Sequence, residues 1–194
     1  MRERGIASFK FFLAYKNRLM LPDEDLIAGF SRCRELGALP QVHAENGDLI
    51  AHLQRKLLSE GVTGPRDHVL SRPPQCEAEA TLRAVTMAEL LDVPPYVVHV
   101  SAAGAAIAGA RARGAKIVGE TLSGFLAIDE SVYADPDFDI AAGHVMSPPY
   151  RPKEYQALLW QALQDGVLST TGTDHCCGRY LSRKPFGPVY QGIM

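Results

Sequence analysis

The sequence has 194 residues, of which 46% are hydrophobic and 22% charged, and its 20 basic and 22 acidic residues give a formal net charge of -2. These values are ordinary for one globular domain and exclude a disordered, collagen-like or coiled-coil chain. No apolar stretch approaches the roughly 20 residues that cross a bilayer, no charged-then-apolar leader opens the sequence, and no basic stripe offers contacts to phosphates. We therefore expect no membrane span, no signal peptide and no nucleic-acid partner. The four cysteines lack CxxC spacing, which favours a reducing cytoplasm.

Strand and helix patterns alternate along the chain. Apolar and β-branched runs predict strands at 8–15, 38–44, 96–101, 116–120 and 167–172. Helical spacing of apolar residues, with capping and stop residues at the ends, predicts helices at 22–37, 46–61, 77–91, 102–113 and 153–164. Residues 62–75 and 121–152 are predicted to be loops. The first strand is so rich in apolar and aromatic side chains that we expect it to be buried on both faces, with Lys10 inside it.

Five strands separated by helices predict an α/β fold with a parallel sheet and right-handed crossovers. The unusual polar residues fall at or close to strand ends, where β/α barrels carry their chemistry, so we expect a partial TIM-type (β/α)8 barrel over residues 1–177. A closed barrel of this type takes about 250 residues and eight strands. An open doubly wound sheet is the alternative, but neither GxGxxG nor GxxxxGK[ST] occurs in the sequence.

Four polar residues are candidates for chemistry because each lies on a different strand or strand end: Lys10, His43, His99 and Asp174. They are far apart in the sequence, so only the mouth of a barrel could gather them. Histidine and carboxylate oxygen are the usual ligands of a hydrolytic zinc site, with one position left to water. A protonated lysine would be repelled there, but condensation with carbon dioxide turns its amine into an anion with two oxygens that can bridge two cations. Burial would favour this reaction because it lowers the pKa of the amine.

Each of the four also has an ordinary structural explanation. A lysine in an apolar run commonly extends its amine to solvent. A single histidine at a strand end is commonly a satisfied structural residue, and an aspartate in a Gly-Thr-Asp turn commonly bonds its own backbone. The occurrence of all four on successive strands favours the metal site. His52 is expected on a helix surface, and His68, His144 and His175 are expected in loops without an assigned role.

The sequence around these residues resembles the dihydropyrimidinase and D-hydantoinase family of cyclic amidohydrolases, within the metal-dependent amidohydrolase superfamily. The resemblance covers about residues 6–177, and its motifs occur in the order of the family. They are SFKFFLAYK (8–16), QVHAENGD (41–48), GVTGP with SRPP (61–74), YVVHVS (96–101), GETLSGFL (119–126), HVMSPPYRP (144–152) and TTGTDHC (170–176).

Position by position, the resemblance implies two divalent metal ions, expected to be zinc, bridged by carboxylated Lys10. It implies that His43 and His99 complete the more exposed metal site. Asp174 is implied to bind the other metal and to act as the base that shuttles a proton.

Two further residues are implied to contact the substrate. Tyr15 resembles the family tyrosine whose hydroxyl steadies the oxyanion, and Ser147 matches the position whose main chain holds the amide edge of the substrate. The implied reaction is metal-dependent hydrolysis of a cyclic amide, which opens 5,6-dihydropyrimidines or hydantoins to N-carbamoyl amino acids. The implied partner is a small cyclic amide or ureide, and the family often forms homo-tetramers.

The chain departs from the family pattern in three ways. It contains no HxH pair, it has no counterpart of the first three barrel strands, and residues 178–194 form a divergent tail. We therefore assign residues 1–177 to strands four to eight of the barrel. The alternatives are a non-catalytic dihydropyrimidinase-related assembly protein, another cyclic amidohydrolase such as an allantoinase or dihydroorotase, and an inert truncated chain. An open five-strand sheet is also expected to self-associate.

Overall fold

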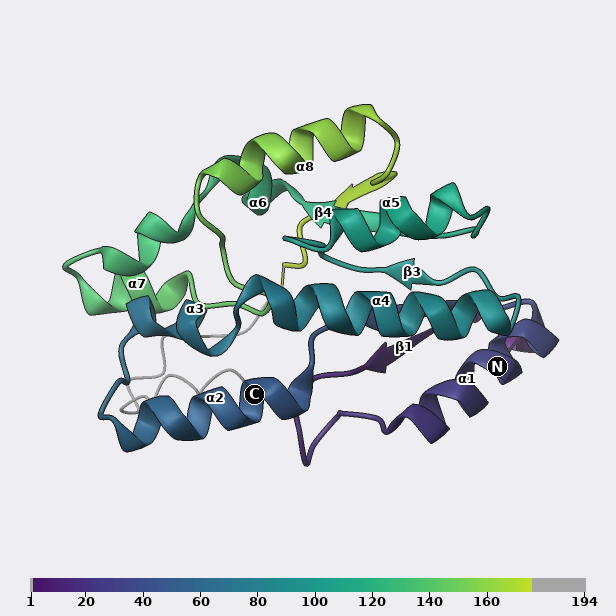
Figure 1. Ribbon diagram of the computed structural model, residues 1–194, viewed down its shortest axis with the longest axis horizontal. Coiled ribbons are helices and arrows are strands. Elements are labelled where there is room, and N and C mark those ends of the chain that lie inside the picture. The colour runs from purple at the N-terminus through teal and green to yellow at the C-terminus, as the bar shows by residue number, and fades with distance from the viewer. Residues whose placement is uncertain (1, 176–194) are drawn as a thin grey trace.

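The computed structural model describes residues 2–175 as a five-stranded sheet with helices packed against it (Figure 1). The strands are β1 (Ser8–Phe12), β2 (Leu39–His43), β3 (Tyr96–Val97), β4 (Val118–Leu122) and β5 (Thr170–Gly172). The α-helices are α1 (Asp23–Leu36), α2 (Gly47–Ser59), α3 (His68–Ser71), α4 (Pro74–Leu90), α5 (Gly104–Ala112), α6 (Ser123–Ala127), α7 (Phe138–Gly143) and α8 (Glu154–Gln164). The 3-10 helices are η1 (Arg2–Arg4), η2 (Pro65–Asp67) and η3 (Glu130–Ala134). The tail predicted at 178–194 lies outside the described residues, as do Cys176 and Cys177.

The sheet is wound in a single direction. Its strand order is β1-β2-β3-β4-β5, and every neighbouring pair is parallel. In Figure 1, α4 and α5 lie on the near side of the strands, with α1 and α8 on either side of them. A doubly wound sheet reverses its strand order at a switch point, and no reversal occurs within residues 2–175. The predicted α/β fold, with five parallel strands of a partial barrel, is confirmed.

Local sequence signals set the ends of the main helices. α1 begins with the acidic residues Asp23 to Asp25, whose charge is favourable at a helix N-terminus. It ends at Gly37, whose φ of 58° places it in the left-handed region that glycine adopts readily. α2 is capped by Asn46, whose side-chain oxygen accepts a hydrogen bond of 3.0 Å from the Leu49 amide.

The hydrophobic core lies between the sheet and the helices that cover it. Val42 and Val97 from the strands, Phe30 from α1, Ala84 from α4 and Ile107 from α5 are each at most 1% exposed. All five belong to one continuous cluster of buried apolar side chains. This core anchors the helices on one face of the sheet and thereby fixes the ends of the strands, from which the polar candidates project.

Lys10 is exposed, contrary to the expectation of a strand buried on both faces. β1 ends at Phe12, three residues earlier than predicted, and its residues are only partly buried. Phe11 packs edge-on against Phe30 of α1, with ring centroids 5.6 Å apart. Because side chains alternate along a strand, Lys10 points to the opposite face, which α1 does not cover. The apolar run therefore has two sources: Phe11 belongs to the face that packs against α1, and Phe12 is an aromatic residue on the opposite face, near His43.

The segments predicted as loops contain short helices. Residues 62–75 hold η2, α3 and the first two residues of α4, so His68 begins a helix, and residues 121–152 hold the end of β4 followed by α6, η3 and α7. Helices of four to six residues show too few turns for apolar periodicity to be visible. The sequence signals that do mark two of these helices are their capping residues. Asp129 accepts a hydrogen bond from an amide in the first turn of η3, and Asp137 accepts from amides in the first turn of α7. The third and fourth strands also differ: β3 has two residues, and β4 begins two residues later than predicted.

Gly47 fixes the approach of α2 to the segment that follows β1. A Cβ at this position would lie 2.9 Å from the Leu13 carbonyl oxygen and 3.1 Å from Ala14 Cα, both backbone atoms that cannot yield cheaply. The Gly47 amide donates a hydrogen bond of 2.9 Å to the same Leu13 carbonyl. This close contact holds the turn that carries Tyr15 beside the end of β2.

None of the helices within residues 2–175 combines the length and the apolar character that crossing a membrane requires. Cys33 and Cys76 are buried free thiols.

Candidate active site

Three of the candidate residues lie at or just beyond the carboxyl ends of strands, and the fourth, Lys10, lies within a strand. Lys10 lies in the middle of β1, His43 is the last residue of β2, His99 follows β3 by two residues, and Asp174 follows β5 by two residues. In the register of the sheet, Phe12 is opposite His43. Because all the strands are parallel, His43, His99 and Asp174 lie at the carboxyl end of the sheet, which is where barrel enzymes place their sites.

Ring contacts and charges show that the candidates lie together. The His43 and His99 rings meet edge-on with centroids 4.6 Å apart, and the Tyr15 and His43 centroids are 5.0 Å apart. Burial lowers the pKa of His99, and the charges of His43 and Lys10 lower it further. The Asp174 carboxylate interacts electrostatically with Lys10 and with Tyr15. The structure therefore gathers residues from four strands around one region, while their roles as ligands stay a prediction.

Three of the candidates adopt left-handed backbone conformations. The φ angles are 65° at Tyr15, 42° at His99 and 48° at Asp174. Residues with a Cβ rarely adopt this region, at a cost of roughly 1–3 kcal/mol each, and such residues cluster at functional sites. The left-handed turn at His99 also ends β3 after two residues. This conformation is the local reason why the longer predicted strand is not formed.

The surroundings of Lys10 lower the pKa of its amine. Its side chain is exposed on the open face, but the amine lies 5.5 Å from the centre of the Phe12 ring. Desolvation by nearby protein atoms lowers the pKa of Lys10, and this effect exceeds the opposing effects of the Asp174 and Glu120 carboxylates. The neutral amine is the form that reacts with carbon dioxide, so this setting suits the carboxylated lysine that the sequence predicts.

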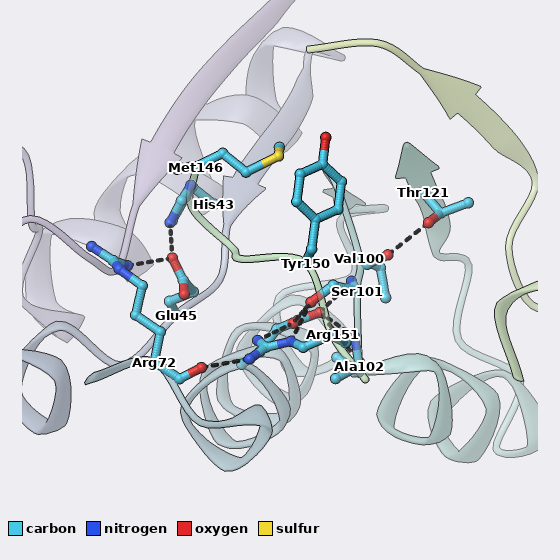
Figure 2. Close-up of polar contacts among 12 residues, drawn as sticks. His43, Glu45, Arg72, Val100, Ser101, Ala102, Thr121, Met146, Tyr150 and Arg151 are labelled. Carbon is cyan, nitrogen blue, oxygen red and sulfur yellow. Dashed lines mark hydrogen bonds and ion pairs between the residues drawn. The ribbon is translucent and has the colours of Figure 1, made fainter. Parts of the chain in front are cut away.

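His43 is held by a buried ion pair (Figure 2). Its Nε2 lies 2.8 Å from Glu45 Oε2, and Arg72 Nη1 donates to the same oxygen at 2.7 Å. All three side chains are at most 4% exposed. Burial alone would raise the pKa of Glu45, but Arg72 and the bond from His43 together hold it well below its usual range. Glu45 is therefore an ionised acceptor, and His43 Nε2 must carry the proton that it donates.

A second buried network holds the turn after His99, and Figure 2 labels its members Ser101, Ala102 and Arg151. Glu77 Oε1 accepts hydrogen bonds from the amides of Ser101, Ala102 and Ala103, at 2.7, 2.9 and 3.2 Å. Glu77 Oε2 accepts from Arg151 Nη2 at 3.1 Å and from the Ser101 hydroxyl. Arg151 Nη1 also donates to the Arg72 carbonyl. The two networks therefore tie together the segments that follow β2 and β3 and the segment that precedes α8.

Tyr15 and Ser147 lie next to each other at the same site. Burial raises the pKa of the Tyr15 phenol, partly offset by Arg72, whose guanidinium carbon lies 5.8 Å from the ring centroid. The phenol is therefore a neutral donor at physiological pH. The Ser147 side chain is buried, and its interaction with the Tyr15 phenol lowers the pKa of Tyr15 by less than burial raises it.

Glu120 of β4 is a further polar residue of this face, which the sequence did not single out. Its Oε1 accepts a hydrogen bond of 3.3 Å from the His99 amide, and its Oε2 accepts one of 2.7 Å from the Tyr96 hydroxyl. Its backbone carbonyl accepts from the Val100 amide at 2.6 Å. Glu120 therefore supports the left-handed turn at His99 from both its backbone and its side chain.

Four other residues that sequence reasoning missed share one property. Glu45, Arg72, Glu77 and Arg151 are charged yet buried, and they form two ion pairs, Glu45 with Arg72 and Glu77 with Arg151, whose members are 27 and 74 positions apart in the sequence. No local pattern reports such distant pairs. The signal that could have found them is the presence of charged residues within apolar or proline-rich segments, such as the HAEN and SRPP stretches of the motifs quoted above.

The buried imidazole of His68 predicts acid sensitivity. Its Nε2 lies 2.8 Å from the Met146 carbonyl oxygen, and burial together with the charge of Arg72 lowers its pKa to about 3. An unfolded chain titrates near pH 6.5 at this group, so below that pH the unfolded state binds more protons and the free energy of unfolding falls. We expect a loss of roughly 2 kcal/mol from this group between about pH 6.5 and pH 4.5.

Urea unfolding at several pH values tests this expectation against the variant His68→Gln, whose amide can donate to the same carbonyl but does not titrate. The variant should lose less stability on acidification than the wild type. Equal acid dependence in the two chains would contradict the assignment.

The residues of the site fit divalent metal ions in their chemistry. His43 donates its Nε2 proton to a carboxylate, the arrangement that commonly orients a metal-binding histidine. Among residues 2–175, no three histidine, cysteine, aspartate or glutamate side chains are grouped as a complete set of metal ligands. A carboxylated lysine adds two oxygens to the set, and Lys10 lies among the other candidates. The donor set of Lys10, His43, His99 and Asp174 therefore suits zinc only with the lysine included.

Comparisons with known proteins agree with this arrangement. No protein-family model matches the chain. The dihydropyrimidinase of Arabidopsis thaliana is 49% identical over 178 residues, covering 91% of this chain and 34% of the plant protein. The dihydropyrimidinase of Rattus norvegicus is 43% identical, covering 99% and 38%, and the D-hydantoinase of Geobacillus stearothermophilus is 45% identical, covering 96% and 40%. The chain spans about a third to two fifths of the length of these relatives.

Solved structures show the same relationship in three dimensions. The D-hydantoinase from Bacillus sp. AR9 matches with a TM-score of 0.93 and 44% identity, over 100% of this chain and 43% of that one. The dihydropyrimidinase from Brevibacillus agri matches with a TM-score of 0.89 and 47% identity, over 93% and 40%. Similarity of sequence and of fold thus extends over nearly all of the described residues. Over the part of their length that it spans, the chain belongs to the dihydropyrimidinase and D-hydantoinase family.

Proposed function

We propose that this chain carries the main part of the active site of a metal-dependent hydrolase that opens cyclic amide rings. The substrates would be 5,6-dihydropyrimidines or hydantoins, and the products N-carbamoyl amino acids. The observation that supports this most is the convergence of Lys10, His43, His99 and Asp174 from four strands, in a chain 40–49% identical to proteins named dihydropyrimidinase or D-hydantoinase. Residues 1–177 would form this unit as strands four to eight of the barrel.

The proposal assigns two metal ions, expected to be zinc, to these side chains. Carboxylated Lys10 would bridge the two, His43 and His99 would bind the first, and Asp174 the second. When bound, the metals supply a hydroxide near neutral pH and polarise the ring carbonyl. Zinc accepts imidazole nitrogen and carboxylate oxygen, as manganese, cobalt and nickel also do.

The remaining steps belong to the protein's own residues. The Tyr15 phenol, neutral because of its burial, donates a hydrogen bond to the carbonyl oxygen as that oxygen becomes negative. Asp174 takes up a proton at its carboxylate and delivers it to the ring nitrogen that leaves. The main chain of Ser147, next to Tyr15, holds the amide edge of the substrate. The result is cleavage of one ring C–N bond, with a carboxylate and a ureido group as products.

The wider setting of the protein is part of the same proposal. The buried thiols of Cys33 and Cys76 suit a reducing, cytoplasmic location. The expected assembly is the homo-tetramer implied by the resemblance, and light scattering on a sizing column would measure it for this chain.

A turnover assay with dihydrouracil and hydantoin tests the function. The zinc-loaded chain is expected to form the ureido acids, detected by mass spectrometry. In Tyr15→Phe, turnover should fall by about 100-fold because one oxyanion donor is lost, while the zinc content should stay unchanged because Tyr15 is not a ligand. A zinc-loaded, folded wild type that forms no more product than Lys10→Ala would contradict the proposal for this chain.

A further inference from the structure

The Glu45–Arg72 pair is buried beneath the candidate site and touches two of its residues. Glu45 Oε2 meets His43 Nε2, and the Arg72 guanidinium lies against the Tyr15 ring. Both donors converge on Oε2, at 2.8 and 2.7 Å, while Oε1 is buried and has no partner among the described residues. The Glu45 carboxylate therefore contacts Arg72 and a single ring nitrogen of His43.

The chemistry of the three groups decides which atom carries the proton in the bond between His43 and Glu45. An arginine has no acceptor atom, and an ionised carboxylate has no proton to donate. Oε2 must therefore accept from both sides, which places a proton on His43 Nε2. In the neutral imidazole, Nδ1 is then the lone-pair nitrogen, the form in which histidine binds a metal. Figure 2 shows Nε2 directed at Glu45.

Stability alone is a weak reason for such a pair. Removing two charges from water is costly, and a buried pair can often be replaced by apolar side chains of similar size without loss of stability. Arg72 is itself anchored, because its carbonyl accepts from Arg151, which is paired with Glu77. The pair thus has a fixed position relative to the turn that follows His99.

We propose that Glu45 and Arg72 are positioning residues that hold His43 in the tautomer with Nδ1 available to a cation. This inference rests on the proposed function, since it concerns one ligand of that site. Arg72 acts through Glu45, and Glu45 acts through His43. Neither residue contacts the reacting atoms.

The test compares two double variants of the full chain. Glu45→Leu with Arg72→Met removes the pair and leaves apolar side chains of similar size. Glu89→Leu with Arg113→Met is the matched control, because it removes an ion pair of 2.9 Å on the exposed surface. Nitrogen-15 spectra of the metal-free chains report the His43 tautomer, and competition with a chromophoric chelator reports the affinity for Zn²⁺. Circular dichroism verifies folding.

We expect the first variant to show mixed His43 tautomers and Zn²⁺ affinity lower by about 10- to 100-fold, with the control within about twofold of the wild type. A wild-type tautomer and affinity in the first variant would overturn the inference. Glu45→Gln, which keeps the shape and an acceptor oxygen, replaces the double variant if that chain does not fold, and should keep the tautomer while weakening Zn²⁺ binding. Wild-type affinity in Glu45→Gln would then overturn the inference. Absence of Zn²⁺ binding in the wild type would overturn the proposed function, and the tautomer measurement distinguishes this from failure of the positioning role.

Discussion

Replacing Lys10 with alanine is expected to abolish specific zinc binding by this chain. In the proposed site, carboxylated Lys10 would join the histidine pair to Asp174, and among the described residues the histidine, cysteine, aspartate and glutamate side chains form no complete ligand set without it. The loss should exceed the roughly 100-fold that removal of an outer partner costs. Elemental analysis of zinc per folded monomer, after a sizing column and dialysis against trace metal, measures the effect.

The variant Lys10→Arg distinguishes a role of Lys10 as a carbamate from a role as a positive charge. The guanidinium stays protonated and cannot take up carbon dioxide, so this variant should lose zinc as completely as Lys10→Ala. Zinc binding by the wild type should also rise with added bicarbonate, whereas binding by either variant should not respond. Retention of zinc in Lys10→Arg would refute the carboxylated lysine, even if the other ligands were correct.

Glu77→Ala is expected to cause the largest loss of stability of any single substitution considered. It would leave Arg151 as an unpaired buried charge, for which a cost of about 3–5 kcal/mol is typical. It would also deprive three consecutive amides, from Ser101 to Ala103, of their acceptor. Native domains are stable by only about 5–15 kcal/mol, so this variant should unfold at a much lower urea concentration or fail to fold.

Glu79→Ala provides the control for this effect on the same helix. Glu79 pairs with Arg83 at 3.1 Å, but its side chain is 44% exposed, and such surface pairs contribute about 1 kcal/mol or less. Equilibrium urea unfolding of the two variants measures the difference. If both lost the same free energy of unfolding, the buried network would not have the stabilising role assigned to it.

The order of the strands and long helices could be predicted because short-range sequence patterns mark each of them. Apolar runs, acidic first turns and stop glycines identify the strands and the long helices, as at α1 and its terminal Gly37. The short helices α3, α6 and α7 could not be predicted in the same way, because they depend on contacts made by the finished fold. For β3 the sequence predicts too long a strand. YVVHVS has strand propensity throughout, but the left-handed turn at His99 ends the strand after two residues.

The site could be predicted only in part for a similar reason. His43, His99 and Asp174 lie at or just after strand ends, and parallel winding brings such ends to the same end of the sheet whatever the intervening sequence, whereas Lys10 lies within β1. The exposure of Lys10 was only one of two alternatives, because an apolar run does not reveal which face of a strand is covered. The buried pairs of Glu45 with Arg72 and Glu77 with Arg151 depend on tertiary contacts that no local pattern specifies.

The single direction of winding also bears on how the chain can fold during synthesis. Each strand pairs with the one next in the sequence, so β1, α1 and β2 can pack before β4 has been translated, and each later unit adds to a surface that already exists. At every stage the most recently added strand presents its unpaired amides and carbonyls to the surroundings. The unpaired edge, which can associate with other chains, therefore moves from one β/α unit to the next as synthesis proceeds. Pauses in translation would prolong the exposure of the strand that was completed last.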